Sequence, residues 1–358
     1  MTSSPVTTDK THLVPSESAW SILAFLRWLL ACIVMFAHLR GIFVEPNSLL
    51  NNIAAFGARA AVLGFFLISG YSIAHSYTQR PEGYFQRRFL RIYPLYCAAV
   101  LFTLLVVWLC PKPAFCLDGH YFKSAGTLTS VANFFLLQEF ISIPLTYDGA
   151  LWSLSIEVFY YLLAPWLYRR SSWFIAFCLL VSMAVFQFVL PKEWLFGYPA
   201  LVWLWPWLIG FLIGRNPARL LLPLCLGAAG AIVVFLSKNT PEPLCIVTYL
   251  VTFTLILLPP RLKLPPIVQG AANFLGDLSY PLYLFHLPLA IFLFQLAGVR
   301  SLGGFVVGII GFTIVFWYLI DLKLKRLFWI PVTRRIVRLV LDSGIASRFR
   351  PAQNSPTR

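Results

Sequence analysis

Two side chains that are costly to bury lie in the first apolar run of this sequence. Arg27 and His38 stand eleven residues apart in LRWLLACIVMFAH. Eleven residues are close to three helical turns, so both side chains share one helix face, about 16 Å apart along the axis. Taken singly, Arg27 would reach toward phosphate headgroups and His38 would be an interfacial residue. Their common face favours a shared channel or cleft, where an imidazole can act as general base or nucleophile.

A second group of basic residues opens the segment YFQRRFLRIYPLY. Arg87, Arg88 and Arg91 lie within about one helical turn. Anchoring at the cytoplasmic face of a membrane accounts for one basic residue at such a position, but not for three on one turn. Guanidinium groups bind phosphates through forked, charge-assisted hydrogen bonds. The cluster therefore predicts a site for a phosphate-rich cytoplasmic molecule, such as a coenzyme A ester.

A carboxylate lies inside another apolar run, WSLSIEVFYYLLAP. Glu157 stands about two helical turns into this run, and Ser153 precedes it by one turn on the same face. Trp152 and Tyr161 flank it. A carboxylate at this depth is either neutral or paired. An arginine partner on a neighbouring helix, with a purely structural role, explains Glu157 as well as a role in catalysis does.

The segment LGDLSYPLYLFHLP carries a polar stripe on an apolar helix. Ser279, Tyr283 and His286 follow the helical period of 3.6 residues, and Pro281 and Pro288 are expected to kink or loosen the helix. A lone histidine would be read as a hydrogen-bonded core residue. Because His286 shares its face with two hydroxyl groups, the stripe instead predicts a polar pocket.

The composition identifies the elements that must position these residues. The chain has 358 residues, of which 59% are hydrophobic and 11% charged, and its mean hydropathy is +0.78. Apolar runs of about 20 residues recur, which is the length needed to cross a bilayer, and they are continuous rather than alternating, as in helices. We predict an all-α, polytopic membrane protein. Ten spans are predicted near residues 20–40, 54–77, 90–110, 149–168, 172–190, 196–214, 219–237, 244–259, 275–297 and 302–321, with an interfacial or re-entrant helix near 125–141.

The distribution of Lys and Arg sets the predicted orientation. With ten spans, twenty of these residues fall on the side that holds both termini and seven on the opposite side. The excess places both termini in the cytoplasm. The net charge of +15 is then a consequence of topology and does not indicate nucleic-acid binding. The predicted organisation is a disordered N-terminus (1–19), a transmembrane domain (20–321) and a basic cytoplasmic tail (322–358), with residues 347–358 disordered and no cleaved signal peptide.

The seven cysteines lack the spacing of a metal site, so no bound metal is expected. Cys110 and Cys116 lie in CPKPAFC, at the mouth of an outer loop. In an oxidising compartment they would form a disulfide, and otherwise they are two free thiols.

Five segments, taken in order, resemble the membrane acyltransferase-3 family, the bacterial O-acyltransferases that modify sugars of surface polysaccharides, lipopolysaccharide and related glycans. Each pattern is weak by itself, but the ordered set is specific and extends from residue 26 to 289. The segments are LRWLLACIVMFAH, FFLISGYSI, RRFLRIYPLY, WSLSIEVFYYLLAP and LGDLSYPLYLFHLP.

The resemblance implies an enzyme of the bacterial inner membrane. It would take acetyl-CoA or another acyl-CoA as co-substrate, hold no permanent cofactor, and acylate a sugar hydroxyl of a glycan or lipid-linked sugar outside the cytoplasm. His38 is implied as the catalytic histidine, and we assign Glu157 as its acidic partner. The acceptor sugar, the acyl chain and the oligomeric state are left open. The resemblance also marks Arg27, Arg87, Arg88, Arg91 and Glu157 as functionally important positions. We predict that the four arginines bind CoA. The predicted pocket residues are Trp152, Ser153, Ser279, Tyr283 and His286.

Two features depart from the family pattern. Members often carry an acidic residue just before the FF of the second segment, where this chain has Leu63 and Gly64. The function of that carboxylate is expected either to be absent here or to be supplied by another group, such as Glu157 or Asp148. In addition, too few residues follow the last predicted span to form the hydrolase-like domain that some relatives carry. The protein is therefore expected to transfer the acyl group itself or to pass it to a partner.

Two other functions use the same polar residues. A transporter or flippase would line a translocation path with them, although no repeat symmetry supports this reading. A non-catalytic subunit of a polysaccharide assembly complex would tolerate loss of His38. Consumption of acyl-CoA separates the enzyme from the transporter.

Overall fold

Helices make up the regular structure of this chain. The computed structural model describes residues 16–41, 48–110, 126–188 and 197–342. In these residues no strand forms, and an isolated bridge joins Gln138 to Ser142. The all-α prediction is confirmed for this part of the chain. The elements are α1 (Glu17–Arg40), α2 (Ser48–Ala54), α3 (Ala58–Gln79), α4 (Tyr84–Leu109), α5 (Thr127–Phe134), η2 (Gly149–Leu151), α6 (Trp152–Tyr168), α7 (Ser172–Phe188), α8 (Tyr198–Val202), α9 (Leu204–Arg215), α10 (Leu221–Leu236), α11 (Cys245–Leu257), α12 (Pro266–Gln295), α13 (Leu302–Phe316), η3 (Trp317–Trp329) and α14 (Ile330–Asp342).

The helices fall into two length classes. Six helical segments of the described chain are long and apolar enough to cross a membrane, and four more are apolar but only 10–17 residues long: α7, α9, α10 and α11. Together they coincide with the ten predicted spans. The six long helices identify a helical membrane protein, whereas the count of ten crossings stays a prediction. The segment predicted to be interfacial or re-entrant forms α5, which has only eight residues.

Several boundaries differ from the sequence prediction for local reasons. α1 begins at Glu17, inside the N-terminus predicted to be disordered, because the Ser16 side chain caps it by accepting a hydrogen bond from the Ala19 N–H at 3.1 Å. The predicted span 196–214 divides at Trp203 into α8 and α9. The helix of the last predicted span continues beyond residue 321, because α13 runs on through η3 into α14. Residues 347–358 lie outside the described chain.

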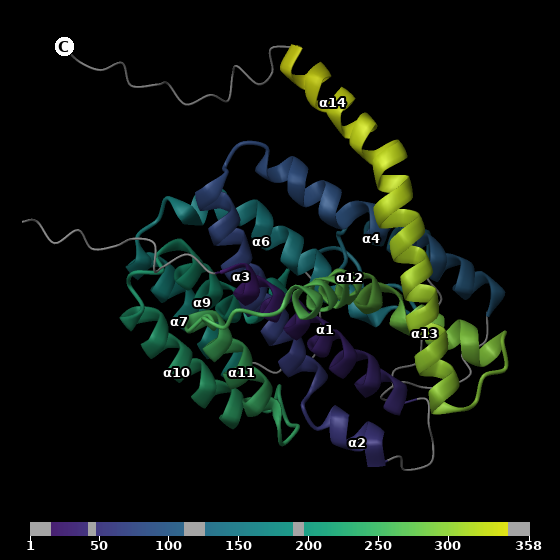
Figure 1. Cartoon of the computed structure of the whole chain (residues 1–358), viewed down its shortest axis with the longest axis horizontal. Helices are drawn as coiled ribbons and strands as arrows, with labels where there is room; N and C mark the ends of the chain where they lie inside the picture. Colours follow the sequence, from purple (N-terminus) through teal and green to yellow (C-terminus); the bar gives the residue numbers. More distant parts are fainter. Residues whose placement is uncertain (1–15, 42–47, 111–125, 189–196, 343–358) are drawn as a thin grey trace, which may run out of the picture.

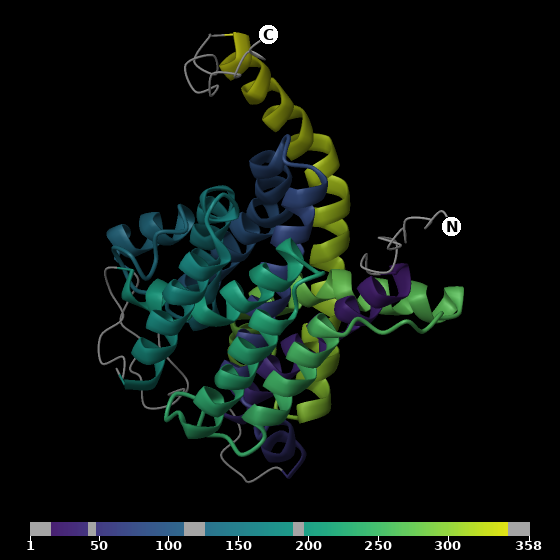
Figure 2. The ribbon, with the colours of Figure 1, turned by 90° about the vertical axis from the view of Figure 1, so that its left-hand side faces the viewer.

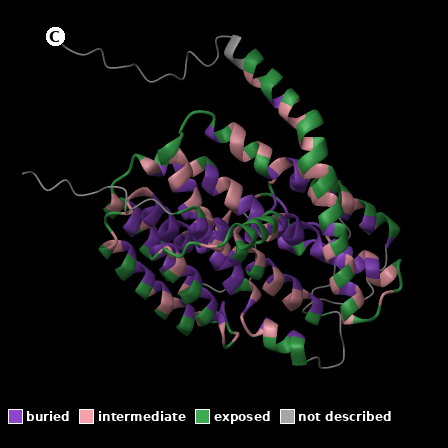
Figure 3. Cartoon of the chain, viewed as in Figure 1, coloured by how far each residue is buried: buried purple, intermediate pink, exposed green. Residues whose placement is uncertain are grey.

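The centre of the bundle is a close crossing of α3 and α9. A Cβ atom on Gly70 would lie 2.0 Å from the Trp207 carbonyl oxygen, and one on Gly210 would lie 2.0 Å from the Leu67 carbonyl oxygen. Small residues allow membrane helices to approach backbone to backbone in this way. Figure 3 shows the buried residues gathered in these central helices and the exposed ones on the periphery and on α14.

We expect Gly210→Ala to destabilise the protein. The new methyl group would meet backbone rather than a side chain that can rotate away, and overpacking of this kind costs about 1–3 kcal/mol or more. Thermal unfolding in detergent micelles measures the effect. Gly311→Ala in α13 is the matched control, because a Cβ there meets nothing within 4 Å. Equal unfolding temperatures for the two variants would contradict the close crossing.

A continuous helical rod from Leu302 to Asp342 flanks the bundle. It runs along one side, and its last helix, α14, projects beyond the other helices (Figures 1 and 2). Its middle part, η3, is a π-helix. Such wide turns are rare and are often found at functional sites.

Candidate active site

The candidate site begins where α1 crosses α12. A Cβ atom on Gly276 would lie 2.5 Å from the Ala24 Cβ atom, so the two backbones are in close approach at this point. Further along the two helices, the His38 and His286 rings lie together, with centroids 5.1 Å apart and planes inclined by 25°. The Nδ1 atom of His38 is 3.0 Å from the Nε2 atom of His286. Two histidines separated by 248 residues in the chain therefore form a direct contact.

His286 is buried, with 2% of its surface exposed, and its second ring nitrogen contacts its own helix. Its Nδ1 atom lies 2.8 Å from the Tyr283 carbonyl oxygen and 3.2 Å from that of Leu282. These two carbonyl groups can only accept a hydrogen bond. They hold the ring of His286 in a fixed orientation toward α1.

Tyr283 links the histidine pair to α6. Its hydroxyl is 2.7 Å from the Ser153 hydroxyl and donates to the Ala150 carbonyl at 3.1 Å. The centroids of the Tyr283 and His286 rings are 6.0 Å apart. The polar stripe predicted on α12 therefore contacts α1 at one end and α6 in the middle. The third member, Ser279, donates to the Gly276 carbonyl of its own helix at 2.6 Å.

A cavity of about 320 Å³ adjoins this stripe. It lies among α1, α3, α4, α6, α12 and η3, and Ser153, Ser279 and Tyr283 contribute to its wall. Its lining is unusually rich in charge for the interior of a membrane bundle. The charged lining residues are Arg27, Arg88, Arg91, Lys325, Glu157, Asp277 and Asp321.

The arginines in the cavity have donors to spare. In the described part of the chain, the buried Nε atoms of Arg27 and Arg88 have no hydrogen-bond partner. The Arg88 guanidinium lies over the rings of Tyr84 and Tyr161, at 5.7 and 5.9 Å from their centroids. These cation–π contacts hold the group in place without occupying its N–H donors. An anion in the cavity could accept hydrogen bonds from those N–H groups.

Arg87 has a different position from Arg88 and Arg91. Its guanidinium donates to the carbonyl oxygens of Arg80 and Glu82 in the turn before α4, and it is absent from the cavity lining. The turn between α3 and α4 offers carbonyl groups without helical partners, which explains this placement. Of the predicted arginine cluster, the structure brings only Arg88 and Arg91 together with Arg27.

Glu157 lies in the cavity wall among the arginines, and its Oε1 atom accepts a hydrogen bond from the Tyr161 hydroxyl at 2.6 Å. Its predicted role beside the His38 imidazole stays a prediction. Trp152 lies outside the cavity lining and packs against Trp203, with centroids 5.1 Å apart. Trp152 thus belongs to the aromatic packing between α6 and the junction of α8 with α9.

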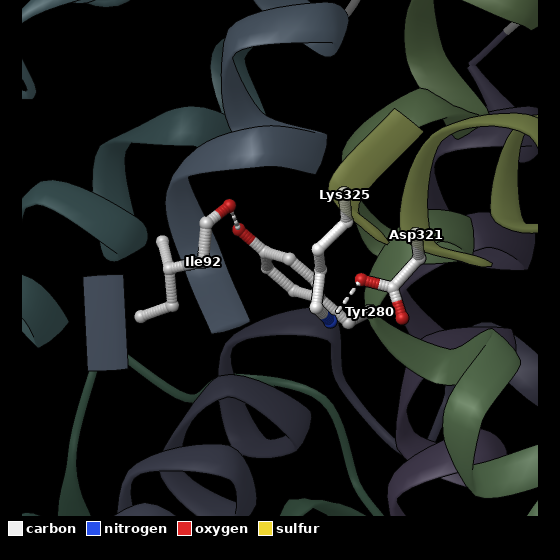
Figure 4. A network of polar contacts seen from close by, with 4 residues as sticks. All are labelled: Ile92, Tyr280, Asp321 and Lys325. Carbon is white, nitrogen blue, oxygen red and sulfur yellow. Dashed lines mark hydrogen bonds and ion pairs between the residues drawn. The ribbon is translucent and has the colours of Figure 1, made fainter. Parts of the chain in front are cut away.

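Among the cavity residues that were not singled out from the sequence, four carry ionisable or phenolic side chains. Asp321 and Lys325 form an ion pair of 2.6 Å on η3, and beside them the Tyr280 hydroxyl donates to the Ile92 carbonyl at 3.0 Å (Figure 4). Asp277 is the fourth. Asp277 is an acidic residue in an apolar run, so the rule that selected Glu157 could have found it. Asp321 and Lys325 could not be found, because they fall at the predicted boundary of span and tail.

Two observations concern the carboxylate that family members often carry and this chain lacks. A Cβ on Gly64 would lie 2.9 Å from the Leu30 side chain and 3.1 Å from the Thr252 hydroxyl, which leaves little room for a larger side chain. Asp148 is fully buried and accepts from the Thr103 hydroxyl at 3.3 Å. Burial raises the pKa of the Asp148 carboxyl well above its usual range, so it is unsuited to supply a negative charge.

Among the described residues, no group of three or more His, Cys, Asp or Glu side chains could hold a metal ion. Cys110 is a buried free thiol, and Cys116 lies outside the described residues.

Known proteins resemble this chain in sequence. A family model described as an acyltransferase domain matches residues 21–321. A protein of Acidianus two-tailed virus named "Putative acetyltransferase ORF330" is 24% identical over 232 residues, which are 57% of this chain and 64% of that protein, so the match spans slightly less than two thirds of the relative. No solved structure matches the chain. The family match extends over the helices that form the cavity and the histidine contact, and the chain belongs to the acyltransferase-3 family.

Proposed function

We propose that this protein is an integral-membrane O-acyltransferase that moves an acetyl or other acyl group from cytoplasmic acyl-CoA to a sugar hydroxyl of a glycan outside the cytoplasm. One observation carries the proposal. A cavity lined by Arg27, Arg88 and Arg91 is joined through Tyr283 to the contact of His38 with His286. His38 and His286 do not line the cavity, but Tyr283 borders both, so a proposed anion site and a proposed base lie next to each other, as transfer from a phosphate-bearing thioester requires.

The proposed topology places donor and acceptor on opposite sides. With ten crossings and both termini in the cytoplasm, Arg88 and Arg91 lie near the cytoplasmic end of α4 and His38 near the outer end of α1. The excess of Lys and Arg on the side of the termini supports this orientation. For a bacterial chain the membrane would be the inner membrane.

The arginines are proposed to bind the phosphates of acyl-CoA. Arg88 and Arg91 are one turn apart on α4, and both face the cavity with Arg27 and Lys325. Guanidinium groups favour phosphate because their N–H donors match its oxygens in pairs. The flexible arm of the donor would then extend past Arg27 toward His38, which brings the thioester to the histidine pair.

The chemistry at His38 is general-base catalysis of thioester alcoholysis. The imidazole takes the proton of the sugar hydroxyl, and the oxygen forms a bond to the thioester carbonyl carbon. The carbon–sulfur bond breaks, and the CoA thiolate leaves and takes up the proton from the imidazolium. Proton and charge balance, and no other reactant is needed. Direct attack by the imidazole, with an acyl-histidine intermediate, would use the same residue.

The test follows both products of the reaction. Purified protein in nanodiscs is incubated with acetyl-CoA labelled in the acetyl group, with and without glycan extracted from the source cells. Without glycan, we expect free thiol to be released slowly by hydrolysis. With glycan, we expect release to be at least about tenfold faster and the glycan to become labelled. This increase lies within what a proton-transfer catalyst can supply, which is about 10²–10⁴-fold. Binding of acetyl-CoA without labelling of the glycan would contradict the proposal that a glycan is the acceptor. Absence of both binding and consumption of acetyl-CoA would contradict the proposal that an acyl-CoA is the donor.

A further inference from the structure

We propose that His286 is a positioning residue that fixes the proton of the neutral His38 imidazole on Nδ1 and so places the lone pair on Nε2. The inference concerns His286, which the sequence indicated only as a pocket residue. The placement of the proton is inferred from the geometry alone. Its importance for catalysis depends on the acyl transfer proposed above.

The proton of His286 is assigned by its backbone contacts. Its Nδ1 atom lies 2.8 Å from the Tyr283 carbonyl oxygen and 3.2 Å from that of Leu282. Because a carbonyl oxygen cannot donate, Nδ1 must carry the hydrogen. A buried imidazolium without a counter-charge is costly in an apolar bundle, which favours the neutral ring. In a neutral imidazole the other nitrogen, Nε2, is then an acceptor.

The proton of His38 follows from that of His286. The Nδ1 atom of His38 is 3.0 Å from the Nε2 atom of His286, so His38 must donate across this contact. With the hydrogen on Nδ1, the neutral His38 ring carries its lone pair on Nε2. A base needs this lone pair on the nitrogen that meets the substrate hydroxyl.

The contact also gains strength during the reaction. When Nε2 of His38 takes up a proton, the ring becomes positive and its Nδ1–H bond to His286 becomes charge-assisted. The carboxylate of a catalytic triad acts in the same way, since it fixes the tautomer and stabilises the imidazolium that forms. Here a neutral imidazole acceptor takes that position. Tyr283, which is held by Ser153 and Ala150 of the neighbouring segment, supplies the carbonyl that keeps His286 in place.

The kinetic test separates positioning from structure. His286→Leu removes the acceptor, whereas His286→Gln keeps an amide oxygen that can accept from His38. For acetyl-CoA turnover we expect the Leu variant to lose about tenfold to a hundredfold in kcat, the size of effect seen when orienting partners are removed, with KM changed by less than about twofold. The Gln variant should recover most of kcat. Equal losses in both variants, or a change in KM without one in kcat, would overturn the proposal.

The spectroscopic test needs no turnover. Wild-type protein labelled with ¹⁵N at its five histidines is studied by NMR in micelles, and His38→Ala assigns the resonance. We expect His38 to be protonated on Nδ1 and unprotonated on Nε2, and His286→Leu to give a mixture of tautomers. A wild-type His38 with its proton on Nε2 would overturn the proposal. If the tautomer is as expected but wild-type protein consumes no acetyl-CoA, the proton placement stands and acyl transfer is contradicted.

Discussion

Replacing His38 with alanine is expected to reduce acetyl transfer by about 10²–10⁴-fold, the contribution of a positioned general base, while acetyl-CoA still binds. The proposed base is lost, but Arg27, Arg88 and Arg91, which are proposed to bind the phosphates, still line the cavity. Thiol release from acetyl-CoA and transfer of labelled acetyl to glycan measure the loss. Binding is measured separately, by equilibrium binding of a non-hydrolysable acetyl-CoA analogue.

The control for His38 is a second histidine inside the bundle. His75 on α3 is half-buried and its ring packs against those of Trp20 and Tyr71, at centroid distances of 5.2 and 6.5 Å. It does not line the cavity. His75→Ala removes an imidazole of the same kind and is expected to keep transfer within about threefold of wild type, since only packing is lost. Normal glycan labelling by His38→Ala would exclude His38 as the base and place the catalytic group elsewhere in the protein.

Replacing Arg88 and Arg91 together with glutamine is expected to weaken acetyl-CoA binding by about two to four orders of magnitude. A hydrogen bond to a charged group contributes about 1.5–3 kcal/mol, and about 1.4 kcal/mol corresponds to tenfold in affinity. Both residues line the cavity, and the buried Nε of Arg88 lacks a partner in the described structure. The analogue-binding assay measures the change. The rate at saturating acetyl-CoA should fall much less than the affinity.

Two single variants make this prediction specific to the cavity. Arg87→Gln removes a charge from the same helical turn, but Arg87 is bonded to the carbonyl oxygens of Arg80 and Glu82. Arg170→Gln removes a charge next to Trp166, where the guanidinium lies 4.5 Å from the ring centroid. Each is expected to change affinity by less than about tenfold, because surface charges contribute little. A loss from Arg87→Gln equal to that of the double variant would show that charge at the membrane face, and not the cavity, binds the donor.

The acidic residues of the cavity set the electrostatic balance in which the arginines act. Asp321 pairs with Lys325, and Glu157 accepts from Tyr161. Asp277 is exposed to the cavity on α12. The negative charges of these carboxylates offset the repulsion between the neighbouring guanidinium groups of the cavity.

The sequence by itself determined the class of the protein and indicated which residues were candidates for its site. Continuous apolar runs can satisfy their backbone groups in lipid only as helices, so the all-α membrane fold follows from composition. Polar residues in such runs are costly, which singled out Arg27, His38 and Glu157 before any contact was known. Helical periodicity placed Ser279, Tyr283 and His286 on one face of α12, and the structure shows Tyr283 and His286 in contact along it.

The tertiary structure decided which of these residues meet. Periodicity describes one helix at a time, so it could not pair His38 with His286 or separate Arg87 from Arg88 and Arg91. The pairing depends on how α1 and α12 cross at Gly276, and the separation depends on the carbonyl groups in the turn before α4. The sequence also could not predict that Asp321 and Lys325 of η3 line the cavity. They reach the cavity because the last span continues as a π-helix alongside α4 and α12, an arrangement that only packing between distant segments produces.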